Sequence, residues 1–289
     1  MFFPKKSLCS LLLFGICAAN AATIDNATLT AVARLQEAHL GARIGIAVVD
    51  TASGETVSYR GNERFPLNST YKALLCGALL SKADKGELSL NDTTQFSQSE
   101  LVEYSPVTSK FVAPATMSWQ QLCSAAVSVS DNTAANLVTK KLGGPAAITR
   151  FIAASGDSVT RLDRYEPELN SAIPGDLRDT TTPLAVSQTL QKLALGDVLT
   201  PGSRAQLVQW MRDDKVANPL LRSVLPAGWE IGDKTGAGAN GSRSIISIVW
   251  PHKNKPRIVT IYITDTKATL AQSNDAIARI GSAIFNATH

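Results

Sequence analysis

Segments rich in β-forming residues lie at the two ends of this 289-residue chain, and that distribution constrains the fold more than any other feature. Near the start they are 43–50 and 56–60, with the turn-forming run Thr-Ala-Ser-Gly between them. Near the end they are 229–236, 244–250 and 257–264, and a break containing two prolines predicts that the last two form a hairpin. Because the economical packing joins such strands in one layer, we expect an antiparallel sheet built from both termini.

Between these two groups, from about residue 65 to 211, the pattern is mostly helical. Two more helices are predicted beside the strands, at 29–40 and 270–285. The apolar residues expected on one side of each helix are Leu29, Val32, Ala33, Leu35 and Leu40 in the first and Leu270, Ile277, Ile280 and Ile284 in the second.

The predicted fold is therefore α/β of the mixed α+β kind, an antiparallel β-sheet flanked by helices plus an all-helical lobe. The sheet lobe is expected at about 23–62 and 213–289, and the helical lobe at about 63–212. Together they form a single expected domain, 23–289. A cleft between the two lobes is where a small-molecule site is expected.

The first residues predict a secretory signal peptide over 1–22. Two lysines precede a short apolar stretch, 8–19, and Ala-Asn-Ala then fits a cleavage site. A lipid-anchored Cys17 is the other interpretation, but Ile16 stands where such a motif needs a small residue. No later stretch reaches the roughly 18 consecutive apolar residues of a membrane span. The mature protein is therefore expected to be exported to the periplasm, with no membrane attachment.

Charge, histidine and cysteine content exclude several classes of partner. The net charge of +4, from 28 basic and 24 acidic residues, is too small and too scattered to indicate nucleic-acid binding. Three widely spaced histidines and the absence of a CxxC motif argue against a metal site. Cys76 and Cys123 are the pair left after signal removal, which favours a disulfide in an oxidising compartment; two buried free thiols are the alternative.

Ser69 and Lys72 are the first residues with a catalytic pattern. Apolar residues recur at helical spacing after Ser69, so this serine is expected at a helix N-terminus, where backbone N–H groups and the helix dipole stabilise negative charge on oxygen. Lys72 lies one turn further on and can approach the Ser69 hydroxyl, whose proton an amine of lowered pKa can accept. A capping serine followed by a solvated lysine is the alternative.

Two triplets complete the pattern. Ser-Asp-Asn at 130–132 lies between two helical segments, where its ordinary interpretation is a turn and a helix cap. Lys-Thr-Gly at 234–236 ends a β segment, and no glycine-rich run leads into it, which excludes a phosphate-binding P-loop. A strand edge carrying a lysine and a threonine next to a small residue offers N–H donors and a cation to a substrate carboxylate.

The three motifs S-x-x-K, S-D-N and K-T-G, in this order, resemble those of the class A serine β-lactamases, and the similarity extends over essentially the whole mature chain. The resemblance implies the fold shared with penicillin-binding proteins, with the active site between the lobes of one catalytic domain. It also implies hydrolysis of the β-lactam amide of penicillins and some cephalosporins through a serine acyl-enzyme, which gives antibiotic resistance. No cofactor is expected, and the family expectation is a monomer.

The resemblance gives each matching residue an expected role. Ser69 is the nucleophile, and either Lys72 or, through water, Glu166 accepts its proton. Ser130 delivers a proton to the ring nitrogen, and Glu166 activates the deacylating water. The expected substrate-binding residues are Asn132, Asn170, Lys234, Thr235, Gly236, Ala237 and Arg243.

Four of these substrate-binding residues have a specific expected part. Asn132 contacts the side-chain amide of the substrate. Asn170 helps Glu166 to hold the deacylating water. Ala237 supplies an oxyanion N–H in addition to that of Ser69, and Arg243 helps to bind the substrate carboxylate.

Four further residues are expected to be structural. Cys76 and Cys123 match a disulfide found in many members, and Arg164 and Asp179 match the ion pair that closes the family's Ω-loop. The peptide bond before Pro167 is expected to be cis, as in the family.

Other positions bear on the substrate. Asn68 and Gly238 stand where carbapenem-hydrolysing members often carry a cysteine pair, so carbapenems are expected to be poor substrates. The stretches 175–183 and 220–229 resemble those of carbenicillin-hydrolysing enzymes, some of which have arginine in place of Lys234. The alternative function is a D-Ala-D-Ala peptidase, a penicillin-binding protein that is acylated but deacylates slowly.

Overall fold

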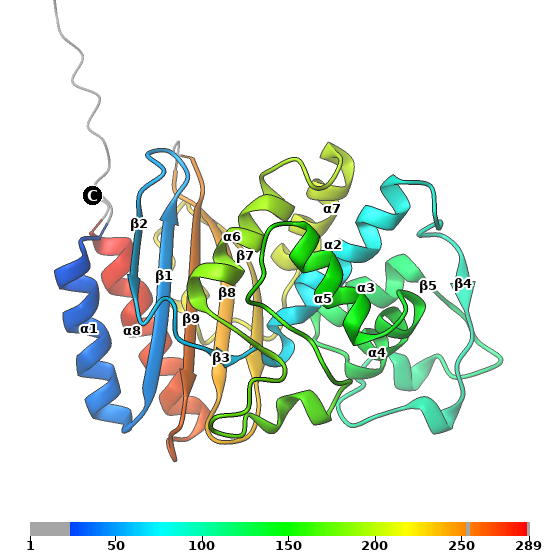
Figure 1. The fold of residues 1–289 in the computed structure, drawn as a ribbon, viewed down its shortest axis with the longest axis horizontal. Helices are drawn as coiled ribbons and strands as arrows, with labels where there is room; N and C mark the ends of the chain where they lie inside the picture. Colours follow the sequence, from blue (N-terminus) through cyan, green and yellow to red (C-terminus); the bar gives the residue numbers. More distant parts are fainter. Residues whose placement is uncertain (1–23, 253–254, 288–289) are drawn as a thin grey trace, which may run out of the picture.

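A five-stranded antiparallel sheet joins the two ends of the chain in the order β2-β1-β9-β8-β7 (Figure 1). Its strands are β1 (Arg43–Asp50), β2 (Thr56–Tyr59), β7 (Glu230–Ala237), β8 (Arg243–Trp250) and β9 (Arg257–Thr264). The computed structural model describes residues 24–252 and 255–287, so the signal peptide expected at 1–22 lies outside the described residues. The sheet predicted from both termini is confirmed, because the N-terminal β1 pairs along its whole length with the C-terminal β9.

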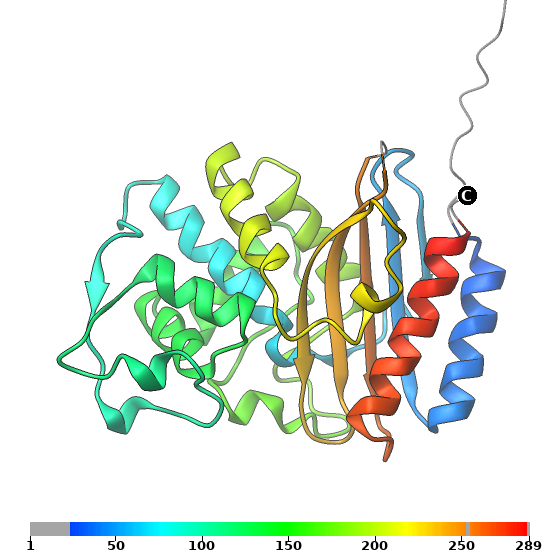
Figure 2. The same ribbon diagram turned by 180° about the vertical axis from the view of Figure 1, so that it is seen from behind.

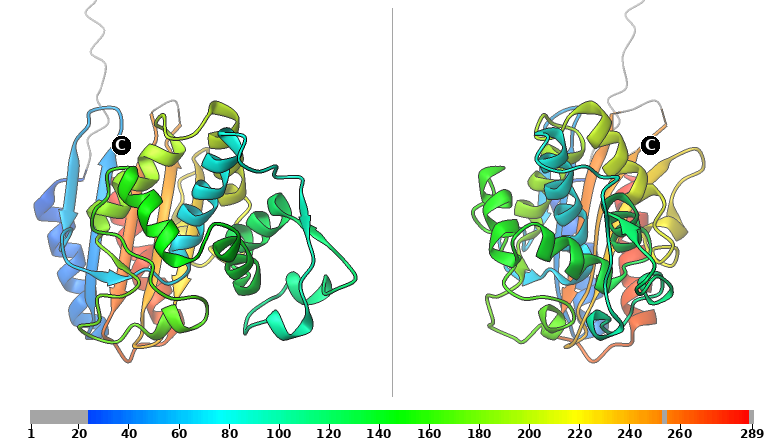
Figure 3. Two further views of the ribbon diagram at one scale, coloured as in Figure 1. Left: turned by 45° about the vertical axis from the view of Figure 1, so that its right-hand side comes forward. Right: turned by 90° about the vertical axis from the view of Figure 1, so that its right-hand side faces the viewer.

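The helices divide between the two faces of this sheet. Their bounds are α1 (Asn26–Leu40), α2 (Tyr71–Asp84), α3 (Trp119–Ser128), α4 (Asn132–Lys141), α5 (Pro145–Ala154), α6 (Pro183–Ala194), α7 (Pro201–Arg212) and α8 (Leu270–Asn286). Figure 2 shows α8 across one face of the sheet with α1 beside it. Figure 3 shows α2 to α5 gathered on the side away from α1 and α8. None of the helices in the described residues is long and apolar enough to cross a membrane.

Because helices cover both faces, the strands are apolar on both faces. In β8, Ile245 and Val249 pack in a core with α1 and α8, whereas Ile246 and Ile248 pack in a second core with the other helices. This two-sided burial explains why the strand reads as a nearly continuous apolar run rather than an alternating one. Two separate two-stranded sheets complete the fold: β3 (Phe65–Pro66) pairs with β6 (Thr180–Thr181), and β4 (Thr93–Thr94) pairs with β5 (Met117–Ser118).

Two details of the sequence prediction are wrong. Leu35 and Leu270 were assigned to the apolar sides of their helices, but 65% and 55% of their surfaces are exposed. Segment 85–116 interrupts the mostly helical middle of the chain, since it holds only β4 and two three-residue turns, η2 (Gln98–Glu100) and η3 (Thr108–Lys110). Polar and turn-forming residues dominate this segment, so it lacks the apolar stripe that a longer helix needs.

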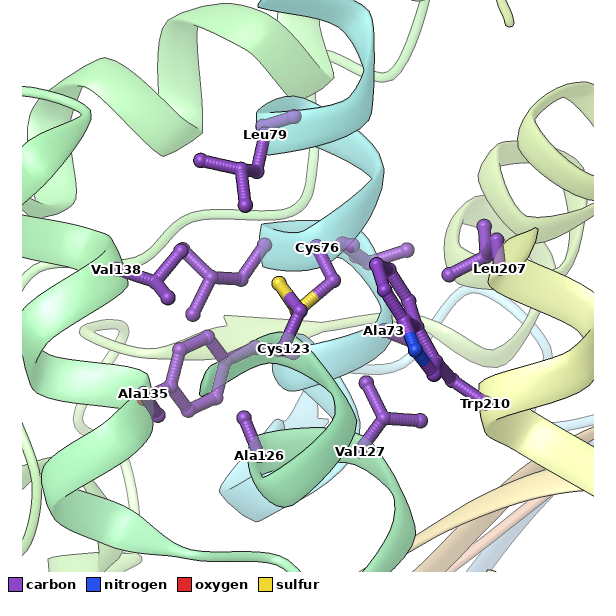
Figure 4. Close-up of a cluster of buried hydrophobic side chains, with 14 of the residues drawn as sticks. Ala73, Cys76, Leu79, Cys123, Ala126, Val127, Ala135, Val138, Leu207 and Trp210 are labelled. Carbon is purple, nitrogen blue, oxygen red and sulfur yellow. A yellow bond between two sulfur atoms is a disulfide. The ribbon is translucent and has the colours of Figure 1, made fainter. Parts of the chain in front are cut away.

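The expected disulfide is present between Cys76 of α2 and Cys123 of α3 (Figure 4). Figure 4 shows it inside the second core, among side chains such as Leu79, Val138 and Trp210. Its position fixes α2 against α3 about one turn beyond Lys72 and seven residues before Ser130. The bridge therefore braces the two segments that carry the first two motifs.

Candidate active site

A cleft of about 710 Å³ opens between the edge strand β7 and the loops of the helical region. The predicted residues that line it are Ser69, Ser130, Asn132, Asn170, Thr235, Gly236, Ala237 and Arg243. Lys72, Glu166 and Lys234 are buried directly behind this lining. The predicted structural residues, two cysteines and the pair Arg164 and Asp179, lie away from the cleft.

Ser69 lies in the short turn η1 (Asn68–Thr70), which leads directly into α2. The preceding Asn68 has a φ of 45°, a left-handed conformation that asparagine adopts more readily than most residues. Its side-chain Nδ2 donates to Ser242 Oγ at 3.1 Å, which ties the turn to the segment before β8. Ser69 is thus held at the N-terminal end of a helix, where the dipole favours negative charge on oxygen.

Gly236 lets strand β7 lie directly against this turn. A Cβ atom at position 236 would be 2.6 Å from Ser244 Oγ, 2.8 Å from Asn68 Cβ and 3.0 Å from the backbone nitrogen of Ser69. No side chain fits in that space, so only glycine allows so close an approach of two backbones. The backbone of β7 is therefore adjacent to the Ser69 N–H group.

Lys72 is completely buried and is surrounded by acceptors. Its Nζ donates to Asn132 Oδ1 at 2.6 Å and to the Ser130 carbonyl at 2.8 Å, and it lies 3.1 Å from Glu166 Oε1. Burial lowers the pKa of Lys72, and the Glu166 carboxylate opposes that shift. Among the described residues Lys72 makes no hydrogen bond to Ser69, whose Oγ instead donates to Glu166 Oε1 at 3.5 Å.

In the Ser-Asp-Asn triplet the aspartate has a structural role, and the serine and the asparagine belong to the site. Asp131 caps α4, because its Oδ1 accepts from the backbone N–H of Ala134, so the ordinary interpretation holds for this residue. Ser130, with a φ of 62°, and Asn132 present oxygens to Lys72 on the other side of the loop. Ser130 Oγ lies 3.4 Å from Lys72 Nζ.

Asn136 positions Glu166, and the sequence analysis missed it. The Asn136 side chain accepts from the Glu166 N–H at 2.9 Å and donates to the Glu166 carbonyl at 2.8 Å. Asn132 and Asn136 are four residues apart on α4, so they project from one face of that helix. That spacing of two asparagines after a predicted cap is the signal from which the second one could have been found.

The loop that carries Glu166 is closed by Arg164 and Asp179. Arg164 Nε lies 2.6 Å from Asp179 Oδ2, and Asp179 Oδ1 accepts from the backbone N–H groups of Asp163 and Arg164. The Glu166–Pro167 peptide bond is cis. Asn170, in the turn η4 (Glu168–Ser171), donates its side-chain amide to Glu166 Oε2.

A second buried cluster surrounds Lys234, and the sequence analysis missed its acidic members. Burial lowers the pKa of Lys234 to about 8, a shift that the nearby Asp214 opposes and that Lys72 and Arg243 reinforce. Burial also raises the pKa of Asp214 and of Asp233, the latter to about 7. Arg222 donates to both carboxylate oxygens of Asp233. Nothing in the sequence marks Asp214 as different from an ordinary surface carboxylate.

Arg243 lies at the cleft end of β8 and is held from two sides. Its Nε donates to Asn274 Oδ1 at 2.8 Å, and its Nη1 donates to the Gly236 carbonyl at 3.1 Å. Two exposed apolar side chains, Tyr104 and Leu270, also line the cleft and were not predicted to do so. The site therefore combines a serine, a buried amine–carboxylate pair and a cationic end formed by Arg243 and Lys234.

Comparison with known proteins gives one consistent result. A family profile described as the β-lactamase enzyme family matches residues 27–288. The chain is 51% identical over 258 residues to β-lactamase AER-1 of Aeromonas hydrophila, covering 89% of this chain and 85% of that protein.

Solved structures agree with this result. An ancestral class A β-lactamase (GNCA) superposes with a TM-score of 0.88 at 47% identity, covering 90% of this chain and 99% of the ancestral one. The putative class A β-lactamase PenP from Rhodopseudomonas palustris does so with a TM-score of 0.88 at 44% identity, covering 90% of this chain and 99% of the other.

The two hydrogen bonds from Asn136 predict that this residue stabilises the loop around Glu166. Asn136→Ala leaves a largely buried N–H and carbonyl unpaired, which is expected to lower the free energy of unfolding by about 1–3 kcal/mol. Urea unfolding measures that loss, and amide hydrogen exchange is expected to quicken within 161–179. The control is Asn91→Ala, at an exposed asparagine. Equal exchange in the two variants would contradict the anchoring role.

Proposed function

The chain belongs to the class A β-lactamases, and on that premise we propose which residues carry out the reaction and which substrates it favours. It is a serine hydrolase that opens the amide bond of the β-lactam ring. One observation carries the assignment of roles: Ser69 Oγ, Glu166 Oε1 and Lys72 Nζ are in continuous contact, at 3.5 Å and 3.1 Å. A hydroxyl in contact with a carboxylate and an amine has a nucleophilic oxygen and two groups that can accept its proton.

In the acylation step Ser69 Oγ attacks the lactam carbonyl and loses its proton. Glu166 is the acceptor in direct contact, and Lys72 is the second acceptor, since burial favours its neutral form. The negative charge that develops on the carbonyl oxygen is met by the N–H groups of Ser69 and Ala237. The close approach that Gly236 permits supports this pairing, and one such donor contributes about 10²–10³ in rate.

Ring opening requires a proton for the departing nitrogen. Ser130 is placed to deliver it, because its Oγ lines the cleft and lies 3.4 Å from Lys72 Nζ. The proton taken from Ser69 thus returns to the substrate through Lys72 and Ser130. General acid catalysis of this kind contributes about 10²–10⁴ in rate.

Hydrolysis of the acyl-enzyme is assigned to Glu166 with Asn170. Asn170 Nδ2 donates to Glu166, while its Oδ1 is buried without a hydrogen-bond partner among the described residues. A water molecule that donates one proton to each of these side chains satisfies that oxygen and faces the ester. Glu166 then removes a proton from the water as it attacks.

The cationic end of the cleft is assigned to the substrate carboxylate. Arg243, Lys234 and the Thr235 hydroxyl offer two positive charges and a donor there, and charge-assisted hydrogen bonds of this kind are the stronger ones. Asn132, which also lines the cleft, is assigned to the amide of the acyl side chain.

We further propose that the mature protein acts as a monomer in the periplasm. The N-terminal pattern and the formed Cys76–Cys123 bridge support an oxidising compartment. Release of the protein by osmotic shock tests the periplasmic location, and light scattering of the purified protein tests the monomeric state. Retention with the cytoplasmic fraction, or the mass of a dimer, would contradict them.

Intact-protein mass after mixing with excess benzylpenicillin tests the assignment. The parent is expected to show a one-penicillin adduct that appears and decays as product accumulates. Ser69→Ala is expected to show none. Glu166→Ala is expected to accumulate the adduct: loss of the carboxylate removes the deacylating base and lowers the pKa of Lys72 further, which leaves that amine as the acylation base.

Three outcomes would contradict these roles. Labelling of Ser69→Ala would move the nucleophile elsewhere. Turnover by Glu166→Ala at the parent rate would remove the deacylating role. A persistent adduct on the parent would return the alternative of a penicillin-binding peptidase.

The lowered pKa of Lys234 predicts an alkaline limit to activity. If the Lys234 ammonium binds the substrate carboxylate, kcat/KM falls as the pH rises through about 8, where the amine loses its proton. Lys234→Arg is expected to move that limb upward by at least about one pH unit, because a guanidinium stays charged. The pH profile of kcat/KM on benzylpenicillin measures the alkaline limit of the parent and its shift in the variant. An alkaline limb that does not move assigns the limit to another group.

We also propose that carbenicillin is among the favoured penicillins, on the resemblance of 175–183 and 220–229 to carbenicillin-hydrolysing enzymes. Carbenicillin differs from benzylpenicillin by one carboxylate on the acyl side chain. The two are expected to have kcat/KM values within about tenfold of each other. Glu103 and Glu168 line the cleft, and repulsion by them is the opposing effect. A loss of about 100-fold on carbenicillin would overturn the proposal.

A further inference from the structure

Leu270 departs from the apolar stripe of its own helix. Ile277, Ile280 and Ile284 of α8 are at most 1% exposed, whereas Leu270 is 55% exposed and lines the catalytic cleft. The start of α8 does not need this leucine, since Thr269 and Gln272 form a capping box there. Leu270 and the exposed Tyr104 both place apolar surface on the lining of the substrate cleft, where a bound ligand can cover it.

The position of Leu270 relative to Arg243 follows from helix geometry. Leu270 and Asn274 are four residues apart and so lie on one face of α8. Asn274 Oδ1 accepts from Arg243 Nε at 2.8 Å. In Figures 1 and 2 the first turn of α8 lies at the same end of the sheet as the turn between β7 and β8. Leu270 therefore stands beside the guanidinium at the cationic end of the cleft.

The chemistry of β-lactams identifies what meets Leu270. The carbon next to the one that bears the carboxylate carries two methyl groups in penicillins and the C3 substituent in cephalosporins. We propose that Leu270 is a specificity-determining residue whose side chain packs against this ring substituent. The inference rests on the proposed function in one respect, the binding of the substrate carboxylate by Arg243.

Two variants that place opposite charges at position 270, Leu270→Glu and Leu270→Lys, test this contact. Two cephalosporins with the same acyl side chain at C7 but different C3 groups, neutral acetoxymethyl and cationic pyridiniomethyl, compete with benzylpenicillin for the enzyme. The readout is the ratio of their apparent inhibition constants, acetoxymethyl over pyridiniomethyl. Leu270→Glu is expected to raise that ratio about 5-fold and Leu270→Lys to lower it by a similar factor, which is the effect of one charge pair about 4 Å apart in water.

Any general effect of the substitution on Arg243 or on folding changes both inhibition constants and so cancels in their ratio. Structural damage also does not explain a ratio that rises in one variant and falls in the other. Leu35→Glu and Leu35→Lys are the matched controls, because Leu35 is also an exposed leucine, on α1, and does not line the cleft. They are expected to leave the ratio unchanged. An active enzyme whose ratio is the same in both Leu270 variants overturns this inference alone. A parent that hydrolyses no benzylpenicillin overturns the proposed function instead, and this inference with it.

Discussion

The buried pair of Lys72 and Glu166 is the constraint on which the rest of the structure depends. Both side chains are fully enclosed, with Nζ and Oε1 3.1 Å apart. Taking two charges out of water costs several kcal/mol per ion, and their mutual attraction offsets this only when further hydrogen bonds satisfy both groups. Asn132 and the Ser130 carbonyl supply them to the lysine, and Asn170 supplies one to the glutamate. Segments distant in the sequence must therefore meet at one point.

The fold meets this requirement through a few rigid elements. Helix α4 presents Asn132 to the lysine and Asn136 to the backbone of Glu166 from a single face. The disulfide joins α2 to α3, which lie just beyond the first motif and just before the second. On the far wall, Gly236 allows β7 to approach the turn that holds Ser69. The site is consequently placed by helix and strand backbones, and loops contribute only where an ion pair such as Arg164–Asp179 closes them.

Sequence patterns predicted the elements well and the supporting side chains poorly. The three motifs sit in local patterns that identify a helix start, a helix cap and a strand end, so their residues could be found one by one. Asn136 and Asp214 act on partners far away in the sequence. The spacing of Asn136 from Asn132 places it on the same helix face but does not identify its partner Glu166, and nothing in the sequence marks Asp214. The prediction that Leu270 is buried is wrong for a different reason. Helical spacing identifies which residues share a side of α8, but it does not show that the first turn of the helix extends past the edge of the core.

The two buried lysines show how similar surroundings yield different chemistry. Burial lowers the pKa of both. Lys72 has a carboxylate at 3.1 Å, so its charge is matched inside the protein and its proton can move along a chain of hydrogen bonds. Among the described residues Lys234 donates only to the Thr235 carbonyl, and burial raises the pKa of its acidic neighbours Asp214 and Asp233, the latter to about 7. The charge of Lys234 is therefore only partly matched inside the protein, and binding of the substrate carboxylate is the role that we propose for it.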